Sequence, residues 1–115
     1  MEFVRITSIA DPLFAAMHRL LGQVFPPEEV LAFEAWEEPL KDPSIRVCVA
    51  VHDGEVVGAT EYRYLPALQV AMTDFTIIGR MGLGVGHFLW LHRTDDLRQM
   101  AHEAGRSILG TFAEI

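Results

Sequence analysis

The chain has 115 residues, which is enough for one folded domain with a hydrophobic core. Hydrophobic residues make up 50%, charged residues 22%, and the mean hydropathy is +0.22, so the composition excludes an intrinsically disordered chain. Nine Lys and Arg residues against 16 Asp and Glu residues give a net charge of -7, which argues against nucleic acid or an anionic membrane as the main partner.

The cysteine content and the N-terminus indicate the compartment. The single cysteine, Cys48, lies between Val47 and Val49, so we expect a core residue and no intrachain disulfide. The N-terminus carries an acid, and no apolar run reaches the about 18 residues that a membrane span needs. The sequence therefore predicts a cytoplasmic protein without a membrane segment.

The first third of the chain predicts a strand and two helices. Residues 3–9 alternate as a strand does, and Asp11-Pro12 then supplies an N-cap and a proline for the first turn of a helix over residues 12–24. Apolar residues recur at helical spacing along that helix. Two prolines end it, and acids at the start of residues 27–38 favour a second helix.

The middle of the chain predicts a β-hairpin followed by another strand. Residues 45–51 and 55–64 are rich in β-branched side chains, and the Asp53-Gly54 pair between them is typical of a tight antiparallel turn. Residues 70–78 then predict a strand that leads directly into a glycine-rich segment.

That segment, residues 79–89, carries a glycine at every second position of its central part. It lies between the predicted strand and a predicted long helix over residues 84–104, which Gly105 would cap. Glycine permits positive φ and close approach of backbone N–H groups, and a helix N-terminus adds about half a positive charge. The pattern indicates a cradle for a phosphate or diphosphate.

Two points about the C-terminal third stay open. Polar residues at 92–96 interrupt the helical pattern, so an alternative makes residues 87–92 a strand and lets Thr94 cap a separate helix. We prefer the long helix, because the glycines then lie at its start. Residues 106–115 predict a final strand.

The predicted order of elements resembles the first two-thirds of the GNAT superfamily of N-acetyltransferases. The family signature is Gln/Arg-x-x-Gly-x-Gly/Ala, and Met81-Gly82-Leu83-Gly84-Val85-Gly86 fits it at Gly84 and Gly86. Residues 47–64, with a core pattern at residues 51–59, are similar to the family's second and third strands. The resemblance implies an α+β fold with a mixed, mostly antiparallel sheet flanked by helices, in one domain over residues 1–115.

The sequence departs from the family pattern at three places. Met81 stands where the family has Gln or Arg, although Arg80 is adjacent. Asp74 and Thr76 occupy a strand that is usually apolar and contains a proline. The family continues with another helix and two strands, so we expect the domain to be incomplete after its fifth strand: a fragment, a chain completed by a partner, or one that has lost activity.

The resemblance implies acetyl-CoA as co-substrate and specific residues that hold it. The strand before the loop would pair with the pantetheine amides, and the loop with the first helical turn would hold the diphosphate. The residues concerned are Phe75, Thr76, Ile77, Arg80, Met81, Gly82, Leu83, Gly84, Val85, Gly86 and His87.

Acetyl transfer needs a base that deprotonates the acceptor amine, and carboxylates next to the loop are the candidates. Asp74 lies on the strand before the loop and Glu61 on the strand before that one. Tyr62 alternates with Glu61 and is expected to pack on the opposite face. The acceptor would be a small-molecule or peptide amine of unknown identity.

Other classes are less favoured. The five histidines show no metal-ligand spacing, so we predict no metal site. A non-catalytic subunit of the same fold could instead act through oligomerisation, as a homodimer or with a completing chain that pairs with the last strand. A Rossmann-type dinucleotide module ranks lower, because His87 takes the place of its last glycine.

Overall fold

The computed structural model describes the backbone of residues 1–113 and the side chains of residues 1–110. It contains a five-stranded sheet in the order β1-β2-β3-β4-β5. The first four strands pair antiparallel, and β5 pairs parallel with β4. This confirms the mixed, mostly antiparallel sheet. The strands are β1 (Glu2–Arg5), β2 (Ile45–His52), β3 (Glu55–Leu65), β4 (Val70–Ile78) and β5 (Gly110–Ala113).

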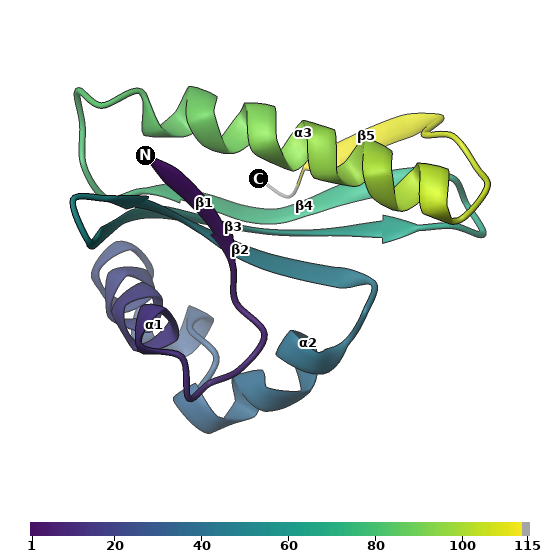
Figure 1. Cartoon of the computed structure of the whole chain (residues 1–115). Coiled ribbons are helices and arrows are strands. Elements are labelled where there is room, and N and C mark those ends of the chain that lie inside the picture. The colour runs from purple at the N-terminus through teal and green to yellow at the C-terminus, as the bar shows by residue number, and fades with distance from the viewer. Residues whose placement is uncertain (114–115) are drawn as a thin grey trace.

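Helices cover both faces of the sheet (Figure 1). On one face lie α1 (Pro12–Val24), the short 3-10 turns η1 (Pro27–Glu29) and η2 (Phe33–Trp36), and α2 (Glu37–Lys41). The other face carries α3 (Val85–Glu103). Both faces are therefore buried along the central strands, and β2 is buried at four consecutive positions.

Side-chain alternation divides the core into an α1 side and an α3 side. Val47 and Val49 pack with the buried face of α1, which includes Phe14 and Met17. Their neighbour Cys48 packs instead beneath α3. Burial raises the pKa of the Cys48 thiol to about 11, so the expectation of a core cysteine is confirmed.

Local signals determined α1 and the hairpin as predicted. The Asp11 carboxylate accepts a hydrogen bond from the Leu13 N–H at 2.9 Å and caps α1 at its predicted start. Asp53 and Gly54 both take positive φ at the hairpin tip, 51° and 78°. The first strand is shorter than predicted, because the Asp11 N–H bonds the Ser8 carbonyl at 3.2 Å in a turn that leads into α1.

The predicted second helix over residues 27–38 is wrong. The segment forms η1, a short extended stretch, η2 and then α2. The Leu31 carbonyl accepts from the Trp36 indole at 3.2 Å and lies 2.9 Å from His18 Nε2, so side-chain rings replace the helical N–H as its partners. Tertiary contacts therefore override the local helical pattern here.

The long third helix is confirmed, and the strand alternative over residues 87–92 is wrong. Two of the polar residues that interrupt its pattern have partners on the sheet: Arg93 donates to Thr76, and Asp96 accepts from Tyr62. Gly105 ends the helix at φ 69°, with the Arg106 N–H bonding the Ala101 carbonyl at 2.9 Å.

The predicted final strand over residues 106–115 is only partly present. The described strand is β5, which starts at Gly110, because the Arg106 N–H is used by the helix cap and the Leu109 N–H bonds the Gln69 carbonyl at 2.7 Å. Residues 114 and 115 lie outside the described residues. In the part of the chain that the structure describes, no helix combines the length and apolar character that a bilayer crossing requires.

Candidate active site

The glycine loop joins β4 to α3. The Gly79 N–H donates to the Val57 carbonyl at 2.8 Å and holds the loop to the sheet. Gly82 and Gly84 take φ values of 89° and 72°, in the left-handed region that favours glycine. A Cβ added at either would meet no atom within 4 Å, so backbone conformation and not space favours glycine at these positions.

Backbone donors gather where the loop enters α3. The first bond of the helix runs from the Phe88 N–H to the Gly84 carbonyl at 3.0 Å. The N–H groups of Val85, Gly86 and His87 precede it and have no acceptor within the helix. The first turn carries no acidic side chain, so the positive end of the helix dipole is not neutralised there. This chemistry fits a diphosphate.

The side chains of the loop are mostly on the surface. Met81 is 85% exposed and Arg80 is also exposed. Leu83 packs against the core beneath the start of α3. The His87 ring stacks on Trp90, with centroids 6.0 Å apart. Among the predicted diphosphate residues, Arg80, Met81, Gly82, Gly84 and His87 are therefore exposed, whereas Val85 is buried in the core.

Gly58 of β3 allows α3 to approach the sheet closely. A Cβ at Gly58 would overlap Val85 Cγ1 and lie 2.9 Å from the Ile77 carbonyl oxygen. The N-terminus of α3 can lie this close to the strands because Gly58 has no side chain.

The predicted pantetheine residues of β4 alternate between the two faces. Phe75 turns to the α1 side, where its ring lies 6.5 Å from Phe25 and 6.4 Å from Trp36. The Thr76 hydroxyl turns to α3, and Ile77 is buried on the α1 side. The described pairing between β4 and β5 covers Val70–Thr73, which ends before these three residues.

A β-bulge gives Asp74 its place. Glu61 of β3 pairs with Phe75 and Tyr62 pairs with Thr73, so Asp74 is the extra residue of β4. Its Oδ2 accepts from Arg63 Nε at 3.0 Å and Nη2 at 2.9 Å. Oδ1 receives no hydrogen bond from the described part of the chain.

Arg63 brings the two predicted catalytic carboxylates together. Its Nη2 lies 3.6 Å from Glu61 Oε1 as well as bonding Asp74. Glu61 and Asp74 are 12% and 13% exposed, so both are largely removed from water. Both candidate bases therefore lie next to the same guanidinium, although Arg63 and Asp74 are 11 residues apart in the sequence.

These carboxylates line a cavity of about 750 Å³ on the α1 side of the sheet. The rest of the wall comes from α1, from the segment that follows it and from the strands. The described lining residues are Leu21, Phe25, Glu29, Val30, Leu31, Trp36, Pro39, Ile45, Glu61, Arg63, Asp74, Phe75 and Thr76. Three of them are acidic, and Arg63 is the one cation among the described lining residues.

Arg93 on the α3 side is a residue that the sequence interpretation missed. Its Nη1 donates to Thr76 Oγ1 at 2.7 Å and to Thr60 Oγ1 at 3.3 Å. No carboxylate among the described side chains forms an ion pair with it, and burial lowers the pKa of the guanidinium below its ordinary value. The only signal in the sequence was the polar interruption of the helical pattern.

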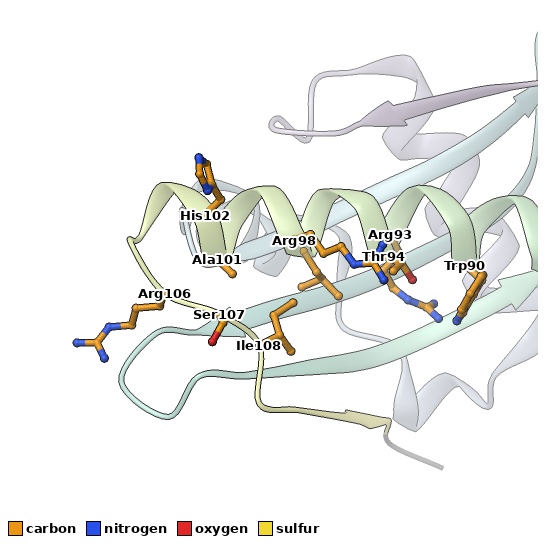
Figure 2. Close-up of a pocket in the computed structure, with 10 residues that line it drawn as sticks. Trp90, Arg93, Thr94, Arg98, Ala101, His102, Arg106, Ser107 and Ile108 are labelled. Atoms are coloured by element: carbon orange, nitrogen blue, oxygen red, sulfur yellow. The ribbon is translucent and has the colours of Figure 1, made fainter.

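Arg93 lines a groove of about 530 Å³ between α3 and the segment that precedes β5 (Figure 2). The Arg98 side chain runs back along the helix toward Thr94, whereas Arg106 and His102 point away from the groove. The described residues that line the groove include three arginines and no Asp or Glu. Its local charge is therefore opposite in sign to that of the whole chain.

Tyr62, next to the candidate base Glu61, packs on the opposite face as expected. Tyr62 is fully buried beneath α3, and its hydroxyl donates to Asp96 Oδ2 at 2.5 Å. Asp96 also lies 3.3 Å from Arg46 Nε. Tyr62 thus ties α3 to the sheet on the face opposite Glu61. In the described part of the chain, no three His, Cys, Asp or Glu side chains gather in a way that could hold a metal ion.

Comparison with known proteins gives a match at the level of structure. The sequence matches no protein-family model, and no curated protein matches it. An aminoglycoside acetyltransferase from an uncultured soil metagenomic sample, solved with trehalose, superposes with a TM-score of 0.75 at 18% identity, covering 99% of this chain and 76% of that one. The chain has the GNAT fold.

Other acetyltransferases of the GNAT fold superpose similarly. A putative acetyltransferase from Agrobacterium tumefaciens gives a TM-score of 0.76 at 15% identity, covering 100% of this chain and 81% of that one. A ribosomal-protein-alanine N-acetyltransferase from Brucella melitensis gives 0.68 at 20% identity, with 98% and 79% coverage. The solved chains therefore contain further residues that the superposition does not cover.

Proposed function

We propose that this chain binds acetyl-CoA through the glycine loop and transfers the acetyl group to an amine. One observation carries the proposal: the left-handed glycines Gly82 and Gly84 precede α3 at the end of the same strand, β4, whose bulge places Asp74 at a cavity. Several of the structural neighbours are acetyltransferases, which supports an acetyltransferase-like function.

The loop and the strand before it would bind the coenzyme. The N–H groups of residues 82–86 would bond the diphosphate, with the helix dipole adding attraction and exposed Arg80 supplying a nearby cation. Phe75–Ile77 would pair with the pantetheine as an added strand does with a sheet edge. The coenzyme would supply an acetyl group activated as a thioester.

The carboxylates would prepare the acceptor. An amine is an ammonium ion at neutral pH and becomes a nucleophile only when it loses a proton. Asp74 Oδ1 would accept that proton directly or through water, and Arg63 would hold the carboxylate in orientation. Glu61 is the second candidate base, held at the same cavity by the same guanidinium. No covalent enzyme intermediate is needed.

Isothermal titration calorimetry with acetyl-CoA tests the first step. We expect saturable binding, and the absence of binding at millimolar coenzyme would contradict the proposal. Binding without release of free coenzyme A thiol, over a panel of amines, would instead favour a non-catalytic subunit that acts with a second copy or another chain.

Asp74→Asn tests the second step. Because a positioned general base contributes about 100-fold or more, acetyl transfer measured by thiol release should fall by about that factor while acetyl-CoA affinity stays unchanged. Asp53→Asn, a carboxylate removed at the exposed hairpin tip, is the matched control and should keep full activity. An Asp74→Asn variant with full activity would exclude Asp74 as the base.

A further inference from the structure

The cavity that holds Asp74 has one apolar wall and one charged end. Phe25, Trp36 and Phe75 form an aromatic wall, in which Phe75 lies edge-on to both other rings at centroid distances of 6.5 and 6.4 Å. The aliphatic side chains of the lining and Pro39 extend this wall. A ligand that fills the cavity must therefore present mostly carbon to it.

The charged end of the cavity is lined by more acidic than basic side chains. The described lining residues include three carboxylates, those of Glu29, Glu61 and Asp74, and one guanidinium, that of Arg63. Arg63 occupies Asp74 Oδ2 and approaches Glu61, so Asp74 Oδ1 is the acceptor position that no described residue fills. An ammonium at Oδ1 would add a charge-assisted hydrogen bond at a largely desolvated carboxylate.

The same wall disfavours polyhydroxylated and polycationic amines. Hydroxyls or extra ammonium groups pressed against Phe25, Trp36 and Phe75 would lose water without gaining hydrogen-bond partners, and each such loss is costly. An amine with a single charge and an apolar body avoids that cost. Its body would bury aromatic or aliphatic surface while its ammonium reaches the carboxylates.

On the basis of the acetyl transfer proposed above, we propose that the acceptor is a primary monoamine with an aromatic or similarly apolar body. The body packs on Phe25, Trp36 and Phe75, and the ammonium bonds Asp74 Oδ1. In the reaction, the ammonium gives one proton to the carboxylate, and the nitrogen forms an amide bond to the acetyl carbon. The carbon–sulfur bond of the thioester breaks, and the second proton of the amine is transferred to the thiolate. The products are an amide, a free thiol and one proton.

Binding of matched ligands to the unaltered chain tests this acceptor class without acetyl-CoA. The probes are 2-phenylethylamine, the uncharged 2-phenylethanol and the polycationic aminoglycoside sisomicin, titrated by calorimetry or ligand-observed NMR. We expect 2-phenylethylamine to bind about 10-fold more tightly than either other probe, because it alone satisfies both ends of the cavity. Equal binding of the amine and the alcohol, or tighter binding of sisomicin, would overturn the inference.

Two variants assign the effect to the two ends of the cavity. Asp74→Asn should remove the preference for the amine over the alcohol and leave alcohol binding unchanged, whereas Phe75→Leu should weaken both ligands by a similar factor. Asp53→Asn should change neither. A preference that survives Asp74→Asn would show that the ammonium lies elsewhere.

The acetyl-CoA titration separates this inference from the proposed function. Acetyl-CoA binding together with no preference among the amines would overturn the acceptor class alone. The expected amine preference together with no acetyl-CoA binding would overturn acetyl transfer alone. Thermal unfolding of each variant reports whether Asp74→Asn still folds, and the wild-type ligand series decides the inference if it does not.

Discussion

The cavity on the α1 side of the sheet and the groove on the α3 side are lined by opposite charges. On the α1 side, β4 presents Asp74 to a cavity with three acidic lining residues and one arginine among those described. On the α3 side, two residues later, the Thr76 hydroxyl accepts from Arg93, which lines a groove whose described lining is free of carboxylates. Because side chains alternate between the faces of a strand and the bulge adds one residue, β4 presents a carboxylate on the α1 side and a hydroxyl on the α3 side.

This contrast is large for an acidic chain. Three of the nine Lys and Arg residues line the groove on the α3 side, although the net charge is -7. Local charge and not net charge determines which ligand each face attracts, because exposed charges are screened beyond about 10 Å. An anionic co-substrate on the loop and α3 side and a cationic acceptor on the α1 side would each meet a complementary surface.

The sharpest test of this contrast places a negative charge at the loop. Gly84→Asp should weaken acetyl-CoA binding by about 100-fold or more, because a carboxylate close to a diphosphate costs about 4 kcal/mol at an intermediate dielectric. Gly84→Asn is the matched control, since Asn and Asp both tolerate the left-handed backbone that Gly84 adopts. Calorimetry on both variants measures the difference.

If Gly84→Asp and Gly84→Asn bound acetyl-CoA equally, the diphosphate would not lie at the start of α3. Amine binding in the α1-side cavity should be the same in both variants. A parallel loss of amine binding would mean that the two faces are not independent.

A smaller effect is expected from adding one methyl group between β3 and α3. Gly58→Ala forces a Cβ against Val85 Cγ1 and the Ile77 carbonyl, so the free energy of unfolding should fall by about 1–3 kcal/mol. Gly22→Ala is the matched control: its Cβ meets nothing within 4 Å on α1, and alanine in a helix should raise stability by up to about 1 kcal/mol. Denaturant unfolding of both variants measures the sign and size.

Gly58→Ala also distinguishes the two faces in function. It displaces the start of α3, so acetyl-CoA affinity should fall in the folded variant, whereas amine binding on the α1 side should persist. An unchanged acetyl-CoA affinity at reduced stability would show that the close approach at Gly58 serves the core alone.

The sequence predicted those parts of the site that depend on neighbouring residues. The Asp11 cap, the Asp53-Gly54 turn and the left-handed Gly82 and Gly84 are each determined within a few positions. The fold could be predicted from the sequence as well, because these local signals occur in the order of the GNAT elements. The two carboxylates were predictable as well, since Asp74 lies on the strand before the loop and Glu61 on the strand before that one.

The remaining features depend on contacts between distant segments. The prediction of a second helix was wrong because the Leu31 carbonyl contacts His18, which is 13 positions away in the sequence. Arg93 was missed because its partners Thr76 and Thr60 lie 17 and 33 positions away. The bulge at Asp74 is a property of strand register, and no residue type in the strand marks it.

The smallest expected effect concerns Arg93 itself, which touches Thr76 from the side opposite the cavity. Arg93→Gln removes a positive charge and the bond to the Thr76 hydroxyl, so acetyl-CoA affinity should fall by about 3-fold to 10-fold, the size expected for one net hydrogen bond. Arg19→Gln, an exposed charge removed from α1, should leave that affinity unchanged. The loss of acetyl-CoA affinity caused by Arg93→Gln should become smaller as the salt concentration is raised, because salt screens electrostatic attraction and does not affect packing contacts. An Arg93→Gln loss that is independent of salt would make Arg93 a residue that positions β4 and not one that attracts the anion.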